Sequence, residues 1–176
     1  MIFWHVGATI AFIRYAFRDE RMDLRFLAFG AILPDLIDTP VGLAFWSKFG
    51  SVRLAAHSLL FAAIVLGAVM VVTRRGDTRK RWMALAIGVL LHLVLDGMWR
   101  LPETLWWPFL GWTFASTPFA TAGAYLTWLF TDLRTWGFEA LGLVYLLVLA
   151  RRSDLGEAEA RHELLTTGRV RAPIGR

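Results

Sequence analysis

The sequence predicts an all-α protein, a polytopic membrane helix bundle of about five membrane-embedded helices. Apolar residues make up 57% of the 176 positions, and the mean hydropathy is +0.52. This composition lies far from that of soluble domains and is typical of small integral membrane proteins. The apolar residues also fall in runs separated by clusters of Arg and Lys, the alternation expected of successive spans.

The predicted helices correspond to five apolar runs: residues 2–17, 26–46, 54–73, 82–101 and 133–150. The first run is short for a crossing, which needs about 20 residues. The second contains Pro34 and Pro40, and we expect it to kink at Pro34 because proline removes a helical hydrogen-bond donor. Together the runs predict one membrane-embedded domain over residues 1–152.

Two segments outside these runs have their own character. Residues 102–132 are rich in Trp and Phe, and we expect an interfacial helix over residues 119–130 because Trp favours the depth of the headgroups. Residues 153–176 are polar and predict a cytoplasmic tail that begins with a short surface helix and ends in disorder.

The positions of the basic residues predict the orientation of the chain. With alternating spans, 15 of the 19 Lys and Arg residues fall on one side. Because cytoplasmic loops are enriched in these residues, the N-terminus is placed outside and the C-terminus in the cytoplasm. The same pattern accounts for the net charge of +5, so we predict the lipid bilayer and no nucleic acid as a partner.

Ionisable side chains interrupt the apolar runs. A charged group at mid-membrane costs roughly 2.5 kcal/mol or more, so such residues usually face a protein interior and serve chemistry or transport. Counted at about 1.5 Å per residue from the span ends, they all fall in the middle or outer half of the membrane. We predict that they converge on one outward-facing site: His5, Asp35, Asp38, His57, His92 and Asp96.

This set of side chains suits a divalent metal ion. The chain has no Cys, and imidazoles with carboxylates suit zinc, and also manganese or iron. Six candidates exceed the four ligands of a closed structural site. They indicate one or two ions, or one ion with Asp35 or Asp38 as a catalytic base toward bound water. Arg53 and Arg100 would hold an anionic substrate, and Trp107 would line the site or contact an acyl chain.

The same residues allow other interpretations. His92 and Asp96, four positions apart on one helix face, could form a hydrogen-bonded packing pair. Asp35 and Asp38 could cap the backbone around Pro34. A metal-bound water with a nearby base predicts a hydrolase. A small ion or proton transporter and a non-catalytic membrane partner protein remain alternative functions.

Taken in order, four motifs resemble those of the YdjM-type family of inner-membrane-associated metal-dependent hydrolases. They are residues 30–38 (GAILPDLID), Arg53 with His57-Ser58, residues 92–96 (HLVLD) and residues 107–109 (WPF). The set is also distantly similar to the zinc-dependent phospholipase C and S1/P1 nuclease group. This resemblance implies that His5, one of the two aspartates, His57, His92 and Asp96 bind zinc in a mononuclear or dinuclear centre. The depth of the site favours a phospholipid or another amphiphile as the substrate, and the resemblance to the phospholipase C group implies a phosphodiester, although an ester would suit the same chemistry. The resemblance to the YdjM-type family also implies a bacterial inner membrane as the location.

Overall fold

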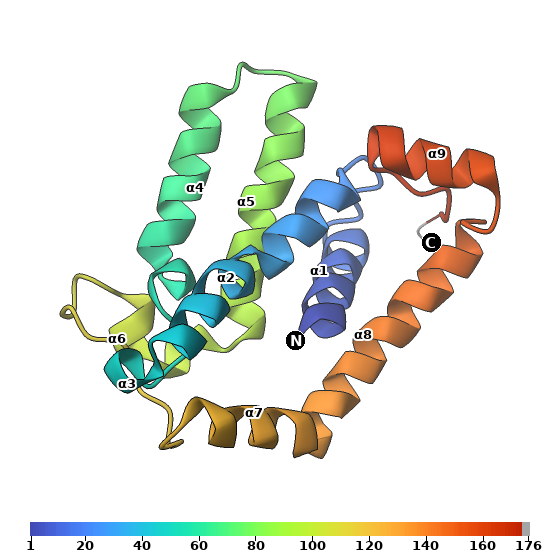
Figure 1. Cartoon of the computed structure of the whole chain (residues 1–176). Coiled ribbons are helices and arrows are strands. Elements are labelled where there is room, and N and C mark those ends of the chain that lie inside the picture. Colours follow the sequence, from blue (N-terminus) through green and yellow to red (C-terminus); the bar gives the residue numbers. More distant parts are fainter. Residues whose placement is uncertain (174–176) are drawn as a thin grey trace.

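Helices make up most of residues 1–173, the part of the chain that the computed structural model describes, and the predicted all-α class is confirmed (Figure 1). In chain order the elements are α1 (Ile2–Ala16), α2 (Leu24–Ala44), α3 (Trp46–Phe49), the 3-10 turn η1 (Ala55–His57), α4 (Leu59–Val72), α5 (Asp77–Leu95), the 3-10 turn η2 (Met98–Arg100), α6 (Pro102–Leu105), α7 (Ala122–Thr131), α8 (Leu133–Arg152) and α9 (Ala158–Thr167). The long helices pack side by side in the order α4, α5, α2, α1 and α8.

The number of predicted membrane spans was wrong. Among the described residues, two helices are long and apolar enough to cross a membrane, α2 and α8, not five. Helices α1 and α4 have 15 and 14 residues and reach only about 22 Å, short of a bilayer core of about 30 Å. Helix α5 has 19 residues, but it begins with the charged sequence DTRKR.

The expected spans were too long because local capping signals set the helix ends, so that α4 begins late and α5 ends early. Ser58 caps the N-terminus of α4 by accepting a hydrogen bond from the amide of Phe61 (3.1 Å), so the helix begins after His57. Helix α5 ends at Leu95, and Gly97 follows in the left-handed conformation (φ +63°) that commonly terminates a helix. Mean hydropathy does not detect either signal.

Helix α2 remains helical through both of its prolines, so the chain does not unwind at Pro34. It begins at Asp23, whose side chain accepts hydrogen bonds from the amides of Arg25 and Phe26. A helix, α7, is present where the sequence predicted one over residues 119–130, and its place at the bilayer interface is still a prediction.

Close approach of α2 and α5 sets the architecture around the candidate site. A Cβ atom at Gly30 would collide with the carbonyl oxygen of Leu85, and one at Gly88 would collide with that of Leu27. Glycine at both positions therefore lets the two backbones touch. Leu27, Val89 and their neighbours fill the apolar core on either side of this contact.

The C-terminal segment folds back against the bundle. The amide of Leu24 donates to the carbonyl of Gly168 (2.8 Å), and Nη2 of the buried Arg14 donates to the carbonyl of Ala172 (2.5 Å). Up to residue 173 the predicted polar tail is thus packed on α1 and α2, whereas residues 174–176 lie outside the described residues. Basic residues from the α1–α2 connection, from the start of α5 and from the segment after α9 gather at this end of the bundle, and the side of the membrane on which they lie is still a prediction.

Candidate metal centre

Four segments bring the predicted ligands together near one end of the helices. Helix α2 carries Asp35 and Asp38, and the 3-10 turn η1 carries His57. His92 lies in the last turn of α5, and Asp96 is the residue at its C-terminal cap. The fourth segment is α1, which carries His5. All three histidines are buried.

Asp38 organises the turn that carries His57. Its Oδ2 atom accepts hydrogen bonds from the amides of Leu54 (2.8 Å) and His57 (3.1 Å), and its Oδ1 atom accepts one from the amide of Ala56 (3.2 Å). Oδ2 also lies 2.7 Å from Nδ1 of His57. Because a carboxylate only accepts, Nδ1 of His57 must carry the proton, and Nε2 presents a lone pair.

His92 is fixed in the same sense by the backbone of α2. Its Nδ1 atom lies 2.7 Å from the carbonyl oxygen of Ala31, which can only accept a hydrogen bond. The proton is therefore assigned to Nδ1, and Nε2 presents a lone pair here too. The contact depends on the close packing of α2 and α5 at Gly30 and Gly88.

The two lone pairs face each other. Nε2 of His57 and Nε2 of His92 are 3.2 Å apart, and neither can donate to the other. Oδ1 of Asp35 lies 3.4 Å from the first and 3.8 Å from the second, and Oδ2 of Asp96 lies 3.7 Å from Nε2 of His57. Four acceptor atoms thus lie within 4.8 Å of one another, an arrangement that a bound cation or a shared proton would stabilise.

The shorter of these spacings, 3.2–3.8 Å, are close to those around a tetrahedral ion. With bonds of about 2.0–2.2 Å to nitrogen and oxygen, two ligands of one zinc ion lie roughly 3.3–3.6 Å apart. The expected divalent-metal site is confirmed to the extent that Asp35, His57, His92 and Asp96 could hold an ion, whose identity the side chains do not fix.

His5 borders this group without belonging to the four. Its ring stacks on that of His92 with centroids 4.3 Å apart, and Nδ1 is hydrogen-bonded to the carbonyl of Met1. Nε2 lies 3.1 Å from Oδ1 of Asp96, so His5 contacts this carboxylate directly.

Arg53 is the predicted substrate-binding residue that reaches the centre. Its Nε atom donates to Oδ2 of Asp96 (2.5 Å). The side chains of Arg53 and Asp35 are each 30% exposed, whereas that of Asp96 is 4% exposed. Arg53 and Asp35 are therefore the residues of this group that reach the protein surface. Tyr125 of α7, which the sequence did not single out, lies close enough to Arg53 to affect its electrostatics.

Arg100 and Trp107 lie elsewhere. Arg100 is exposed on η2, and within residues 1–173 its side chain contacts none of the four ligand residues. Trp107 packs with Trp112 and Phe114, with ring centroids 5.8 and 5.5 Å away. Their roles in substrate binding are still predictions.

Comparison with known proteins agrees with the motifs. The model of the YdjM inner membrane protein family matches residues 3–156, so the chain belongs to this family. No curated protein and no solved structure matches the chain.

Proposed function

We propose that this member of the YdjM inner membrane protein family is a metal-dependent hydrolase that uses one divalent ion, zinc in the first instance. One observation carries the proposal: the Nε2 atoms of His57 and His92 face each other at 3.2 Å while both Nδ1 atoms are committed to acceptors. Buried acceptors without a donor are costly, and a bound cation removes that cost.

The donor set supports zinc. Nε2 of His57, Nε2 of His92 and the carboxylate of Asp96 would hold the ion and leave a fourth position for water, a ligand set that zinc accepts readily and that manganese or iron also accepts. Each histidine donates a hydrogen bond from its Nδ1–H group to an oxygen, which fixes the ring and is the usual arrangement around bound zinc.

The surrounding residues suit hydrolysis. A zinc ion supplies an activated water, whose pKa falls to about 7. Asp35 is the one partly exposed carboxylate of the four, so it is the residue placed to accept a proton from that water. Asp38 has all its hydrogen bonds directed at the η1 turn and His57, and we assign it a positioning role in place of a catalytic one.

The substrate class follows from charge and location. Arg53 presents a guanidinium group beside the open face of the centre, which favours an anionic group such as a phosphodiester. In a membrane protein, the anionic compounds within reach are amphiphiles. We therefore propose a phospholipid or another phosphodiester or ester amphiphile as the substrate.

Two measurements test the proposal separately. The metal content of the purified full chain, measured by mass spectrometry, should be close to one ion per chain for the wild type. His92→Ala and Asp96→Ala should lose the ion, and the exposed His162→Ala serves as the matched control. A wild-type protein that stays metal-free when offered zinc, manganese and iron would refute the metal site.

Hydrolysis is then measured on the metal-loaded protein with fluorescent phospholipids and a chromogenic phosphodiester. Loss of turnover in Asp35→Asn with the metal retained would support Asp35 as the base. A metal-loaded wild type that cleaves neither substrate class would leave the metal site intact but overturn the hydrolase.

A further inference from the structure

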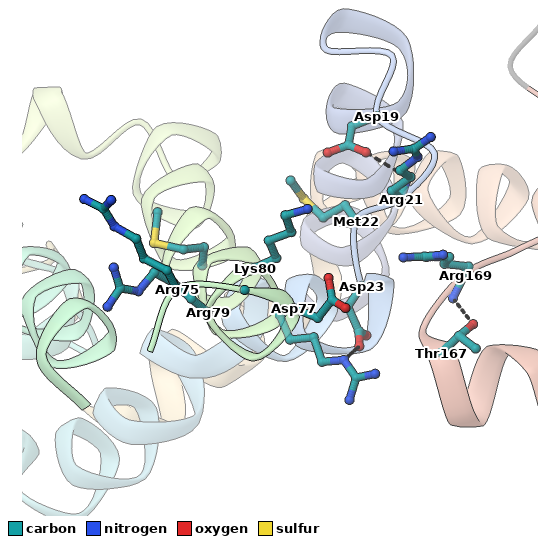
Figure 2. A pocket seen from close by; sticks show the side chains of 13 residues that line it. Asp19, Arg21, Met22, Asp23, Arg75, Asp77, Arg79, Lys80, Thr167 and Arg169 are labelled. Carbon is teal, nitrogen blue, oxygen red and sulfur yellow. Dashed lines mark hydrogen bonds and ion pairs between the residues drawn. The ribbon is translucent and has the colours of Figure 1, made fainter. Parts of the chain in front are cut away.

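A second charged site lies at the opposite end of the bundle. A cavity of about 860 Å³ opens between the α1–α2 connection, the start of α5 and the segment after α9 (Figure 2). Six basic side chains line it against three acidic ones. The basic residues are Arg21, Arg75, Arg79, Lys80, Arg81 and Arg169, and the acidic residues are Asp19, Asp23 and Asp77. The volume lies in the range of small-molecule sites, roughly 300–1,000 Å³.

Most of the acidic charge in this basic pocket is already committed. Oδ2 and Oδ1 of Asp23 accept hydrogen bonds from Nη2 (2.6 Å) and Nε (3.0 Å) of Arg25. Oδ1 of Asp19 accepts one from the amide of Arg21 (2.8 Å). Asp77 lies in the first turn of α5, where a carboxylate offsets the positive end of the helix dipole.

Much of the basic charge is not committed. Arg79 donates to carbonyl oxygens at the end of α4, and Nε of Arg81 is 3.9 Å from Asp23. By contrast, within residues 1–173, Arg75, Lys80 and Arg169 form no ion pair with a carboxylate, and all three are exposed. These three cations come from different segments and surround one cavity, so they attract an anion in common.

The position of the pocket indicates what kind of anion this is. Asp23, in its wall, is the residue before α2, one of the two helices long enough to cross the membrane. Met22 and Met83 supply apolar lining. Next to Met83 in the chain, the exposed Trp82 packs edge-on against Phe26 (ring centroids 5.0 Å apart), and tryptophan is the residue type enriched at a bilayer surface. An anion bound here lies at headgroup depth beside an apolar wall.

We propose that the basic pocket binds the phosphate group of an anionic phospholipid. Basic pockets at the ends of membrane helices are typical sites for such headgroups. This proposal does not rest on hydrolysis at the metal centre.

Calorimetric titration of the purified full chain in a zwitterionic detergent tests the proposal. The ligand is short-chain phosphatidylglycerol, and phosphatidylcholine of the same chain length and inorganic phosphate are the comparison arms. We expect saturable binding of the phosphatidylglycerol, no binding of the phosphatidylcholine and much weaker binding of phosphate. Phosphate that binds as tightly as the lipid would overturn the lipid assignment in favour of a free-anion site.

The variants separate a built site from general surface charge. The triple variant Arg75→Gln, Lys80→Gln, Arg169→Gln should weaken binding about a hundredfold, since each basic residue near anionic lipid contributes roughly fivefold. The matched variant Arg18→Gln, Arg74→Gln, Arg151→Gln removes the same charge outside the pocket and should weaken binding less than about threefold. Equal weakening by both variants would overturn the proposal.

A variant that strengthens binding guards against a loss caused by misfolding. Asp77→Asn removes an exposed negative charge from the pocket wall and should tighten binding about fivefold. Unchanged affinity in this variant would also count against the site.

Discussion

Replacing Asp38 by Asn tests whether this residue positions His57. The carboxylate accepts from three backbone amides and from the imidazole Nδ1, at 2.7–3.2 Å, and is 3% exposed. An amide side chain has a single oxygen, so its NH2 group must face at least one buried N–H. Losing one charged acceptor bond and weakening the others costs about 3–5 kcal/mol. Because 1 kcal/mol shifts Tm by about 2–4 °C at this chain length, Tm should fall by about 10 °C.

The assay is the thermal melting of the metal-free protein followed by circular dichroism, together with zinc affinity from competition with a chelator. Asp38→Asn should lower both Tm and zinc affinity, the latter roughly 10- to 100-fold as for other groups that orient a metal ligand. Asp35→Asn should lower zinc affinity and leave the metal-free Tm within about 2 °C, because no backbone amide depends on Asp35. A metal-free Tm that is unchanged in Asp38→Asn would refute the positioning role.

Three further outcomes follow from the structure. Gly88→Val should break the contact of α2 with α5 at the Leu27 carbonyl and lower Tm by about 5 °C or more. The control Gly67→Val should lower Tm far less, because a Cβ atom at Gly67 meets no atom within 4 Å. Equal Tm values for the two variants would contradict the close approach of the helices. Chelators should lower the Tm of the zinc-loaded wild type, since zinc at a hundred times its Kd stabilises by about 2.7 kcal/mol, and added zinc should restore it. Burial raises the pKa of Asp23, but Arg25 outweighs burial and brings the pKa below the unfolded value of 3.8. The stabilisation is therefore present above about pH 4 and is lost as the pH falls below it, so Asp23→Asn should flatten the acid limb of a Tm against pH profile.

The sequence grouped the residues that could hold a metal ion because ionisable groups in apolar runs are conspicuous. Asp35, His57, His92 and Asp96 are up to 61 residues apart, and all four meet in the structure. Their depth within the apolar runs was enough to group them, since polar side chains in such segments must find one another or water. His5 was grouped with them by the same reasoning and lies against His92 and Asp96.

What the sequence could not predict depends on local backbone geometry and long-range packing. The spacing of Asp35 and Asp38 places both on one side of a helix, but only the path of residues 54–57 reveals that Asp38 is occupied by backbone amides. The carbonyl of Ala31 has no side-chain signature at all. The polar composition of the C-terminal segment likewise did not predict that Ala172 is buried and accepts a hydrogen bond from Arg14.

The two proposed sites lie on the same pair of helices, and the distance between them along these helices indicates separate functions. Asp23 and Asp35 mark the basic pocket and the metal centre on α2, and Asp77 and His92 mark them on α5. At about 1.5 Å per residue these pairs are roughly 18 and 22 Å apart along the helix axes. A phosphate held in the pocket therefore cannot reach the metal centre, so a lipid bound in the pocket is a structural or regulatory ligand and not the substrate in place for cleavage. It follows that zinc binding should survive the triple substitution in the pocket, and lipid binding should survive His92→Ala.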